Sequence, residues 1–232
     1  LLYKASDQLQ FIASSEVDLN IPGHPSRNIL VADFLVNSKP LSLFINHWPS
    51  QHQSVQTRLK AASLIKEVID NKLAENNKTN VIVMGDFNTI DSDRPYPFDI
   101  FTNSETNKLF DVDAQYRKSR NLSSLEKNKQ PLGSYFFPKD MSWNLLDHFF
   151  VNKNLLNSSD LHLDLVSYKI HAPVFAKTDY LYNEDANYPI DSTDSRYGTI
   201  IKNTPINFNF STENMDQIGY SDHFPIAVKI LW

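Results

Sequence analysis

Short apolar runs, interrupted by one long helical pattern, constrain the fold of this chain most. Six segments are rich in β-branched or aromatic residues and short enough to be strands. They are residues 27–36, 41–46, 81–84, 145–151, 161–170 and 226–232. Strands that outnumber helices in this way favour layered α/β or α+β architecture.

The one long helix is predicted between the second and third of these segments. Its apolar residues recur at steps of three and four and would form a single stripe on one helix face. They are Val55, Leu59, Ala62, Ile65, Ile69 and Leu73. Ser50 and Gln53 have the spacing of a capping box, so the helix is expected to begin there and to end near Asn76. Residues 37–40 predict a hairpin between the first two strands.

Two polar segments are expected to be loops within a single domain that spans residues 1–232. Residues 115–131 are polar and mildly basic. Residues 178–219 are rich in Asn, Asp, Tyr and Thr, and a connection of that length is unusual unless it is functional or partly structured.

Composition excludes several classes of protein. The 232 residues include 22 basic and 27 acidic side chains, a net charge of 22 − 27 = −5, and no cysteine. Disulfides, thiolate zinc sites and a cysteine nucleophile are therefore excluded. No stretch approaches the roughly 18 apolar residues that a membrane-spanning helix needs. The acidic balance disfavours a protein that holds nucleic acid by charge alone, but it suits an enzyme that approaches phosphate through a divalent cation.

The beginning of the chain is unusual. The residues at 1–4 resemble the interior of a strand, and they lack the pattern of a targeting segment. We expect a processed or trimmed product whose natural beginning lies upstream. The compartment stays open, with secreted, periplasmic and cytoplasmic locations all compatible with the sequence.

Polar clusters stand at the ends of the apolar runs or within them. Asp86 and Asn88 follow the run at 81–84. Residues two apart on an extended segment point to the same side, so this pair could orient a water or contact a metal-bound phosphate. Gly, Asp and Asn are also ordinary turn residues, and a strand that ends in a polar turn is the commoner case for such a pair taken alone.

Asp147 is surrounded by apolar residues and therefore needs a partner. His148 would point to the other face of the strand, so we expect it to be a packed or surface histidine. His223 is the better partner, because a carboxylate that accepts from one ring nitrogen fixes the histidine tautomer. Asp222 would diverge from His223 and suits a metal, whereas His47 is a second candidate for contacting phosphate.

Each histidine alone is more often structural than catalytic. Together, the histidines, carboxylates and asparagine would suit metal-assisted hydrolysis of a phosphoester.

Four motifs in this order resemble the endonuclease/exonuclease/phosphatase superfamily. They are NHWPS at 46–50, GDFN at 85–88, LDHFFV at 146–151 and GYSDHFP at 219–225. The superfamily includes pancreatic-type deoxyribonucleases, exonuclease III-like abasic-site endonucleases, neutral sphingomyelinases and inositol-polyphosphate 5-phosphatases. The resemblance covers the chain from about Arg27 to its end. It implies a four-layer α/β sandwich, with two mixed β-sheets face to face, helices outside and the site at one edge.

The resemblance also implies a role for each matched residue. His223 would act on the attacking water or the phosphoryl oxygens, oriented by Asp147. Asp86 and Asn88 would position the water and the phosphate. Asp222, with Asp86, would bind Mg²⁺ or Mn²⁺, with Ca²⁺ as a further candidate.

Three more positions are expected to contact the substrate. His47 would contact a phosphate oxygen or help the leaving group depart, and Asn46 beside it is a candidate substrate-binding residue. Arg27 matches a family position whose arginine can reach phosphate, although a solvated arginine beside a hairpin is an equal alternative.

One departure from the family pattern concerns the metal. The family carries an Asn near its first strand and a metal-binding Glu on a later one, and Glu16 falls after the expected position. We therefore expect an incomplete metal site and a fold that lacks its N-terminal part. The missing portion would lie upstream or on a complementing chain, and this fragment alone would expose apolar surface and could be inactive.

The preferred function is a Mg²⁺- or Mn²⁺-dependent phosphodiesterase, an endonuclease or exonuclease that acts on DNA more than on RNA. Basic residues within 117–129 could replace the counterions of such a substrate, or they could simply form a solvated loop. One alternative keeps the chemistry but acts on a phospholipid or small phosphate ester. Another is a non-catalytic binding module that has kept the fold.

Overall fold

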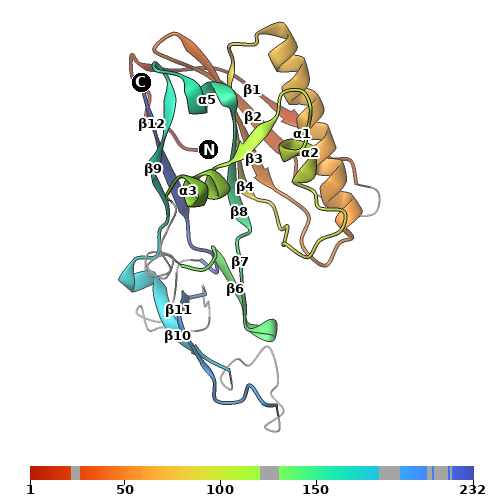
Figure 1. Cartoon of the computed structure of the whole chain (residues 1–232), viewed down its shortest axis with the longest axis vertical. Coiled ribbons are helices and arrows are strands. Elements are labelled where there is room, and N and C mark those ends of the chain that lie inside the picture. Colours follow the sequence, from red (N-terminus) through yellow and green to blue (C-terminus); the bar gives the residue numbers. More distant parts are fainter. Residues whose placement is uncertain (22–26, 121–130, 183–193, 208–210, 212–218, 220) are drawn as a thin grey trace. The chain divides into compact units, whose positions relative to one another are not determined.

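A mixed six-stranded sheet is the centre of the fold (Figure 1). The computed structural model describes residues 1–21, 27–120, 131–182, 194–207, 211, 219 and 221–232. The strand order is β1 (Leu9–Val17), β2 (Ile29–Val36), β3 (Lys39–His47), β4 (Asn80–Asp86), β8 (Asp147–Asn152) and β5 (Leu109–Asp111). Only β3 and β4 pair in parallel within this sheet. The α/β class is confirmed, although the described strands form one large sheet and three two-stranded sheets rather than two large ones.

Helix α1 (Val55–Glu75) connects β3 to β4 and covers one face of the sheet. Its apolar stripe is confirmed, because Ala62, Ile65, Ile69 and Leu73 are buried. The predicted start is wrong. Ser50 and Gln53 instead close a turn in which the Gln53 N–H donates to the Ser50 carbonyl at 2.9 Å, and the helix begins after Ser54.

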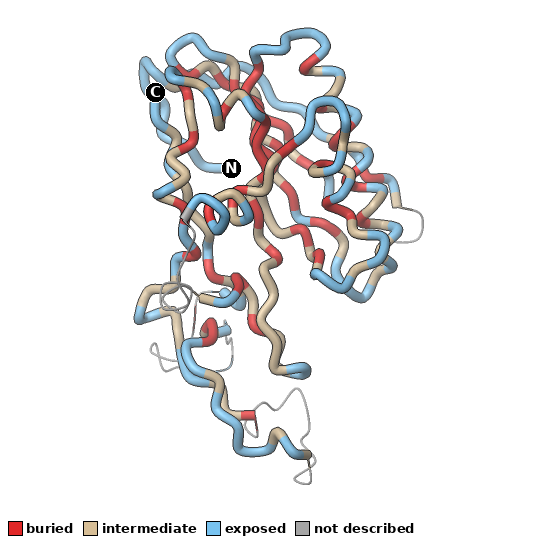
Figure 2. The backbone as a smooth tube through the Cα atoms, viewed as in Figure 1, coloured by how far each residue is buried: buried red, intermediate tan, exposed pale blue. Residues whose placement is uncertain are grey.

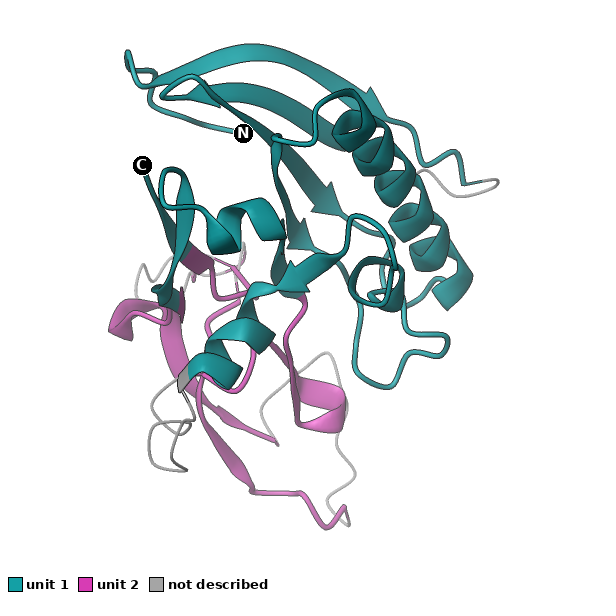
Figure 3. Cartoon of the chain, turned by 45° about the horizontal axis from the view of Figure 1, so that its top comes forward, with its two compact units in different colours: residues 1–121, 147–168, 228–232 teal, residues 122–146, 169–227 magenta. Residues whose placement is uncertain are grey.

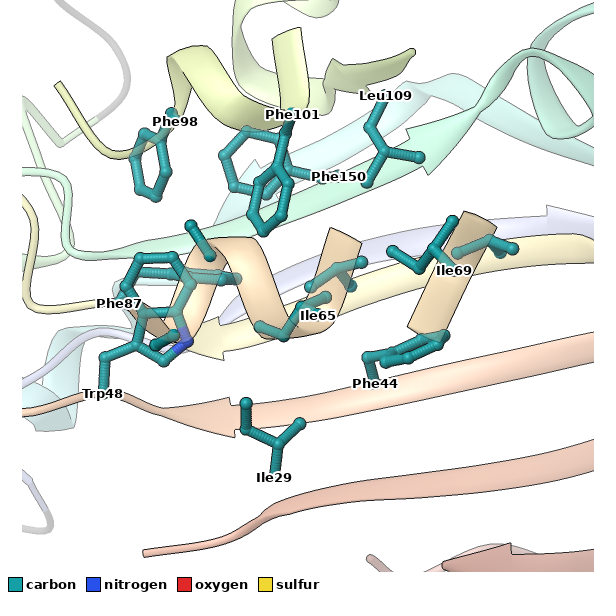
Figure 4. Packing of buried hydrophobic residues seen from close by; sticks show 14 of the residues in the cluster. Ile29, Phe44, Trp48, Ile65, Ile69, Phe87, Phe98, Phe101, Leu109 and Phe150 are labelled. Carbon is teal, nitrogen blue, oxygen red and sulfur yellow. The ribbon is translucent and has the colours of Figure 1, made fainter. Parts of the chain in front are cut away.

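An aromatic core fills the space between α1, the short helix α2 (Asp99–Thr102) and the sheet (Figure 4). Trp48 and Phe87 meet edge to face with ring centroids 4.8 Å apart, and Phe98 lies 4.7 Å from Phe150. All four side chains are almost fully buried. Figure 2 shows that buried backbone is concentrated in the central strands and the inner side of α1.

The opposite face of the sheet is only partly covered. Strand β12 (Ile226–Leu231) pairs with β9 (His162–Ile170), and the end of β12 helps to enclose an apolar cavity of about 280 Å³ over the sheet. Phe34, Leu43, Met84 and Phe149 line it from the sheet side. Two further residues that line the cavity are themselves exposed, Leu2 fully and Trp232 by 54%.

The chain divides into two compact units (Figure 3). Unit 1 comprises residues 1–121, 147–168 and 228–232, and unit 2 comprises residues 122–146 and 169–227. Unit 2 contains two short pairs of strands. They are β6 (Tyr135–Phe137) with β7 (Ser142–Asn144), and β10 (Lys177–Leu181) with β11 (Ile200–Pro205). The prediction of a single domain stays a prediction.

Several elements were not apparent in the sequence. The segment 178–219 contains most of β10 and all of β11, whose alternation is too weak to indicate strands. Residues 115–120 belong to helix α3 (Val112–Arg120), so the expected loop at 115–131 is wrong there, and its residues 121–130 lie outside the described part. Helix α5 (Lys153–Asn157) and strand β1 were also missed. In the described parts of the chain, no helix combines the length and apolarity needed to cross a bilayer.

Candidate active site at the ends of three strands

Three predicted site residues meet at one edge of the six-stranded sheet. Strands β3 and β4 run in parallel and end at His47 and Asp86, whereas the antiparallel β8 begins at Asp147. In the register, His47 pairs with Asp86 and Asp86 pairs with Asp147. Directly paired residues present their side chains on the same face of a sheet. The fold therefore brings one histidine and two carboxylates, distant in the sequence, to neighbouring positions.

His47 is held between a cation and a carboxylate. The Arg27 Nη1 lies 3.1 Å from His47 Nδ1, and His47 Nε2 lies 3.6 Å from Asp86 Oδ2. A guanidinium can only donate, so Nδ1 must accept and the ring proton of neutral His47 resides on Nε2. Nearly half of the His47 side chain is exposed, which leaves it accessible to a ligand. In this structure Arg27 therefore contacts His47 and fixes the position of its ring proton. Its contact with phosphate stays a prediction.

Asp86 and Asn88 form one hydrogen-bonded unit. The backbone N–H of Asn88 donates to Asp86 Oδ1 at 2.8 Å, which closes a tight turn. The Asn88 side-chain Nδ2 donates to the Trp48 carbonyl at 3.0 Å and to Asp86 Oδ2 at 3.3 Å. Asn88 has a φ of 46°, a left-handed conformation that Asn tolerates better than most residues. The amide is therefore fixed, and its Oδ1 keeps a defined direction.

Gly85 allows strands β3 and β4 to approach each other closely where the site residues lie. Its φ is 131°, and a Cβ at this position would lie 2.0 Å from the backbone oxygen of Asn46. Only glycine fits this approach between β3 and β4.

Asn46 has an internal role in the structure. It is 5% exposed, its Nδ2 donates to the carbonyls of Phe44 and Met84, and its Oδ1 accepts from the indole N–H of Trp48 at 3.0 Å. These bonds hold Trp48 in the aromatic core. The predicted contact of Asn46 with substrate is untested. Both polar atoms of its side chain already form hydrogen bonds within the protein.

Arg58 is an important residue that the sequence reasoning missed. Its side chain is almost fully buried on α1, and its Nη2 donates to Asp93 Oδ1 at 2.9 Å. Its Nη1 donates to the carbonyls of Ser50 and Gln53 at 3.3 and 3.4 Å. Arg58 therefore joins the loop after β3 to the loop after β4. One feature of the sequence could have identified it. Arg58 precedes Ala61, Ala62 and Ile65 by three, four and seven residues, and this spacing places it on the buried face of the helix.

A second link connects the same two loops. Gln51 Nε2 donates to the backbone carbonyl of Asn88. The segment that follows His47 and the segment that carries Asn88 are consequently fixed to each other at two places.

His148 is confirmed as a packed histidine on the face opposite Asp147. Its ring is 6% exposed and lies among Phe98 and Phe150, and its Nδ1 is 3.0 Å from Asp111 Oδ2. Burial acts to raise the pKa of Asp111, but attraction and hydrogen bonding to His148, with backbone N–H bonds from Asp113 and Ala114, lower it overall. This pair stabilises the core rather than the site edge.

His223 and Asp222 belong to unit 2. The His223 backbone N–H donates to Ser221 Oγ at 3.1 Å, and its ring centroid lies 4.9 Å from that of Tyr135. His223 also forms an isolated β-bridge with Tyr135, and the next residue, Phe224, is buried. The β-bridge partner Tyr135 was not apparent in the sequence. The predicted pairs of His223 with Asp147, and of Asp222 with Asp86, join residues of different units and stay predictions.

Carboxylate oxygens are the ligands that Mg²⁺ and Mn²⁺ prefer, and Asp86 and Asp147 supply them at neighbouring register positions. Within the residues that the structure describes, however, no group of three or more His, Asp or Glu side chains is arranged to hold a metal ion. The described residues alone therefore do not make a complete metal site.

Comparison with known proteins identifies the family of the chain. The sequence profile of the Endonuclease/Exonuclease/phosphatase family matches residues 1–231. No curated protein matches the sequence.

Solved structures share the fold at low identity. A mannosyl-6-phosphatase from Bacteroides thetaiotaomicron is 18% identical with a TM-score of 0.54, and the match covers 98% of this chain and 68% of that one. TDP2 from Caenorhabditis elegans is 12% identical with a TM-score of 0.56, covering 98% and 52%. D. rerio TDP2, complexed with a single-strand DNA product, is 16% identical with a TM-score of 0.52, covering 96% and 68%.

This chain thus spans between about half and two thirds of the length of these structures. With the profile match over nearly all its residues, the chain belongs to the endonuclease/exonuclease/phosphatase family, whose members are generally phosphoric ester hydrolases.

Proposed function

We propose that this protein hydrolyses phosphodiester bonds in nucleic acid, DNA more than RNA, with an activated water and a divalent cation such as Mg²⁺ or Mn²⁺. One observation carries the proposal: His47, Asp86 and Asp147 occupy neighbouring register positions at one sheet edge, beside an Asn88 fixed by Asp86. A histidine, two carboxylates and an oriented amide are the groups that such a hydrolysis uses.

His47 would contact the phosphoryl group. Its Nε2–H can donate to a non-bridging oxygen, because Arg27 occupies Nδ1 and thereby fixes the tautomer. Asp86 faces the same Nε2 and holds the backbone of Asn88. A phosphate oxygen bound here would gain a positioned donor, which is the usual way an enzyme stabilises charge that develops in the transition state.

Asp147 and His223 would activate the attacking water. In this proposal, the Asp147 carboxylate orients His223, and His223 withdraws the proton of the attacking water or stabilises the phosphoryl oxygens. Asp86 and Asp222 would contribute oxygen ligands to the cation. When bound, the cation would neutralise negative charge on the phosphate.

The first experiment separates this activity from its alternatives. The purified 232-residue chain is incubated with supercoiled plasmid, single-stranded DNA and RNA, in Mg²⁺, in Mn²⁺ and in EDTA. Nicking or cleavage with metal, abolished by EDTA, supports the proposal. Turnover of DNA that persists unchanged in EDTA would contradict the metal dependence, and no turnover of any phosphoester by the complete protein would favour a binding module that has kept the fold.

A pair of histidine variants tests the assignment. His223→Ala should lower kcat by about 10²–10⁴-fold if the imidazole acts as an acid–base or charge-stabilising group. The matched control is His171→Ala, since His171 is an exposed histidine of the same unit. An unchanged rate for His223→Ala, with a normal melting temperature, would remove His223 from the mechanism.

A small phosphate ester or a phospholipid is the second candidate substrate. The net charge of −5 favours it, because binding a nucleic-acid backbone requires cationic groups that displace counterions. Parallel assays with a sugar phosphate, a phospholipid vesicle and a DNA oligonucleotide would decide between them by kcat/KM.

A further inference from the structure

A cavity lined mainly by lysine and asparagine residues lies at the other end of β4 from Asp86. Strand β4 runs from Asn80 to Asp86, and a strand rises by about 3.3 Å per residue, so the two ends are roughly 20 Å apart. The cavity has a volume of about 480 Å³. Its walls come from the start of β3, the segment after α1, the start of β4 and helix α5. We name it the lysine pocket after Lys39, Lys78 and Lys153, which line it.

The charge of this pocket is opposite to that of the whole chain. Among the described residues that line it, three lysines are accompanied by a single carboxylate, Asp160, so this lining carries 3 − 1 = +2 in a chain of net charge −5. Lys39 Nζ lies 2.9 Å from Asp160 Oδ2, but both side chains are about half exposed. Such an exposed pair is weak, so Lys39 can turn toward an anion at little cost.

The other two lysines are exposed, and across the described residues neither Lys78 nor Lys153 has an ion-pair partner. The ammonium groups of Lys78 and Lys153, and that of the weakly paired Lys39, carry like charges at one cavity. An anion bound among them would reduce their mutual repulsion. A multivalent anion satisfies them better than a single carboxylate would, since each ammonium is a compact donor of up to three hydrogen bonds.

The polar wall behind the lysines is already fixed. Asn80 is 5% exposed and its Nδ2 donates to the Pro40 carbonyl at 2.9 Å. Asn154 Nδ2 donates to the carbonyls of Asn77 and Thr79, both at 3.0 Å. These bonds tie α5 to the segment that precedes β4 and keep the cavity open. A site ordered before its ligand arrives loses less entropy on binding.

Uncharged polar groups complete the lining. Asn77, Asn157 and Ser158 line the same cavity. Carboxamides and hydroxyls recognise hydroxylated ligands, because each can both donate and accept hydrogen bonds. Among the described residues that line the cavity, Leu161 is the only apolar one.

We propose that the lysine pocket binds a phosphate group carried by a hydroxylated small molecule, at a site separate from the His47–Asp86–Asp147 edge. The lysines hold the phosphate, and the asparagine-rich wall receives the hydroxyl groups. This inference does not depend on the proposed reaction, because every residue that carries it lies at the other end of β4.

Binding of three probes in EDTA tests the pocket. Inorganic phosphate, glucose 6-phosphate and glucose are titrated into the whole chain at low ionic strength, and binding is followed by calorimetry. Glucose 6-phosphate should bind more tightly than inorganic phosphate, and glucose should not bind. Equal affinity for the two phosphates would overturn the role of the asparagine wall, and no binding of either would overturn the site.

Two lysine triple variants give the decisive contrast. Lys39→Gln/Lys78→Gln/Lys153→Gln should weaken glucose 6-phosphate binding by about tenfold or more, since three charge-assisted contacts are lost. The control Lys4→Gln/Lys108→Gln/Lys229→Gln removes the same charge at exposed positions outside the pocket and should bind as the unmodified chain does. Equal weakening in both variants would show that net charge alone is responsible.

A variant of the other edge separates this site from the proposed activity. His47→Ala should leave glucose 6-phosphate binding unchanged, even if it abolishes hydrolysis. Loss of binding in His47→Ala would place the phosphate at the reaction edge and overturn the lysine pocket. Intact binding, together with a complete protein that hydrolyses no phosphoester, would instead count against the proposed function alone.

Discussion

The two faces of the six-stranded sheet carry neighbouring residues that have opposite roles. Asn46 and His148 point into the covered face, where they bond to Trp48 and Asp111 and are almost fully buried. Their sequence neighbours His47 and Asp147 belong to the other face, at an edge that is open enough for half of His47 to be exposed. Side chains that alternate along a strand allow one short motif to serve both the core and a site.

The difference also concerns packing. The covered face is filled by interlocking aromatic rings under α1 and α2. The open face retains an apolar cavity of about 280 Å³, lined partly by Phe149. Close packing makes the first face intolerant of substitution, whereas the second already contains empty space.

Truncation of the two adjacent phenylalanines should show the largest contrast. Phe150 is fully buried on the covered face, so Phe150→Ala should lower the free energy of unfolding by about 3–5 kcal/mol. Phe149→Ala should cost less, because Phe149 already borders a cavity. Urea denaturation of both variants measures this, and equal losses would mean that the two faces are equally well packed.

Removal of the buried guanidinium should affect stability and activity together. Arg58→Met leaves the mostly buried Asp93 without its ion pair and should cost about 3–5 kcal/mol. It should also lower kcat, because the loops after β3 and β4 lose their shared anchor.

Lys66→Met on the same helix is the matched control for Arg58→Met. Its ion pair with Asp70 lies within α1 and contacts neither loop, so it should leave kcat unchanged. If both variants lowered kcat equally, general loss of stability rather than loop positioning would be the cause.

His47→Ala should separate activity from stability on the open face. If Nε2 supplies a positioned donor to the phosphoryl group, kcat should fall by about 10²–10³-fold, with little change in melting temperature because the ring is half exposed. His52→Ala, an exposed histidine in the following loop, serves as the control. A normal kcat for His47→Ala would leave this edge without its proposed phosphate contact.

The smallest expected effect is a pH dependence of the covered face. The pKa of Asp111 is lowered in the folded state, so its contribution to stability is present above the unfolded pKa and is lost as pH falls through the folded value. His148→Phe removes the partner whose attraction and hydrogen bond lower the pKa of Asp111, so burial, which raises that pKa, is opposed only by the backbone N–H bonds of Asp113 and Ala114.

The variant should therefore lose less stability than the unmodified protein as the pH falls from 7 to about 3, below the unfolded pKa of about 4. Denaturation curves at the two pH values measure this difference. An identical acid loss in both proteins would show that the Asp111–His148 pair does not govern the slope.

The sequence was informative where the patterns are local. Period-two alternation and β-branched residues located β2, β3, β4, β9 and β12, and the apolar stripe located α1. The same alternation correctly separated His148 from Asp147, because two adjacent strand residues cannot share a face. The mostly exposed strand β1 and the short strands of unit 2 carried too little alternation to be recognised.

The sequence by itself determined which residue types are present at strand ends and, through four ordered motifs, the family to which the chain belongs. Tertiary structure alone decided which of them meet. The register placed His47, Asp86 and Asp147 side by side, gave Asn46 an internal role and brought buried Arg58 between two loops. The physical reason is that strand pairing and burial join residues tens of positions apart, and no local period records which strand lies beside which.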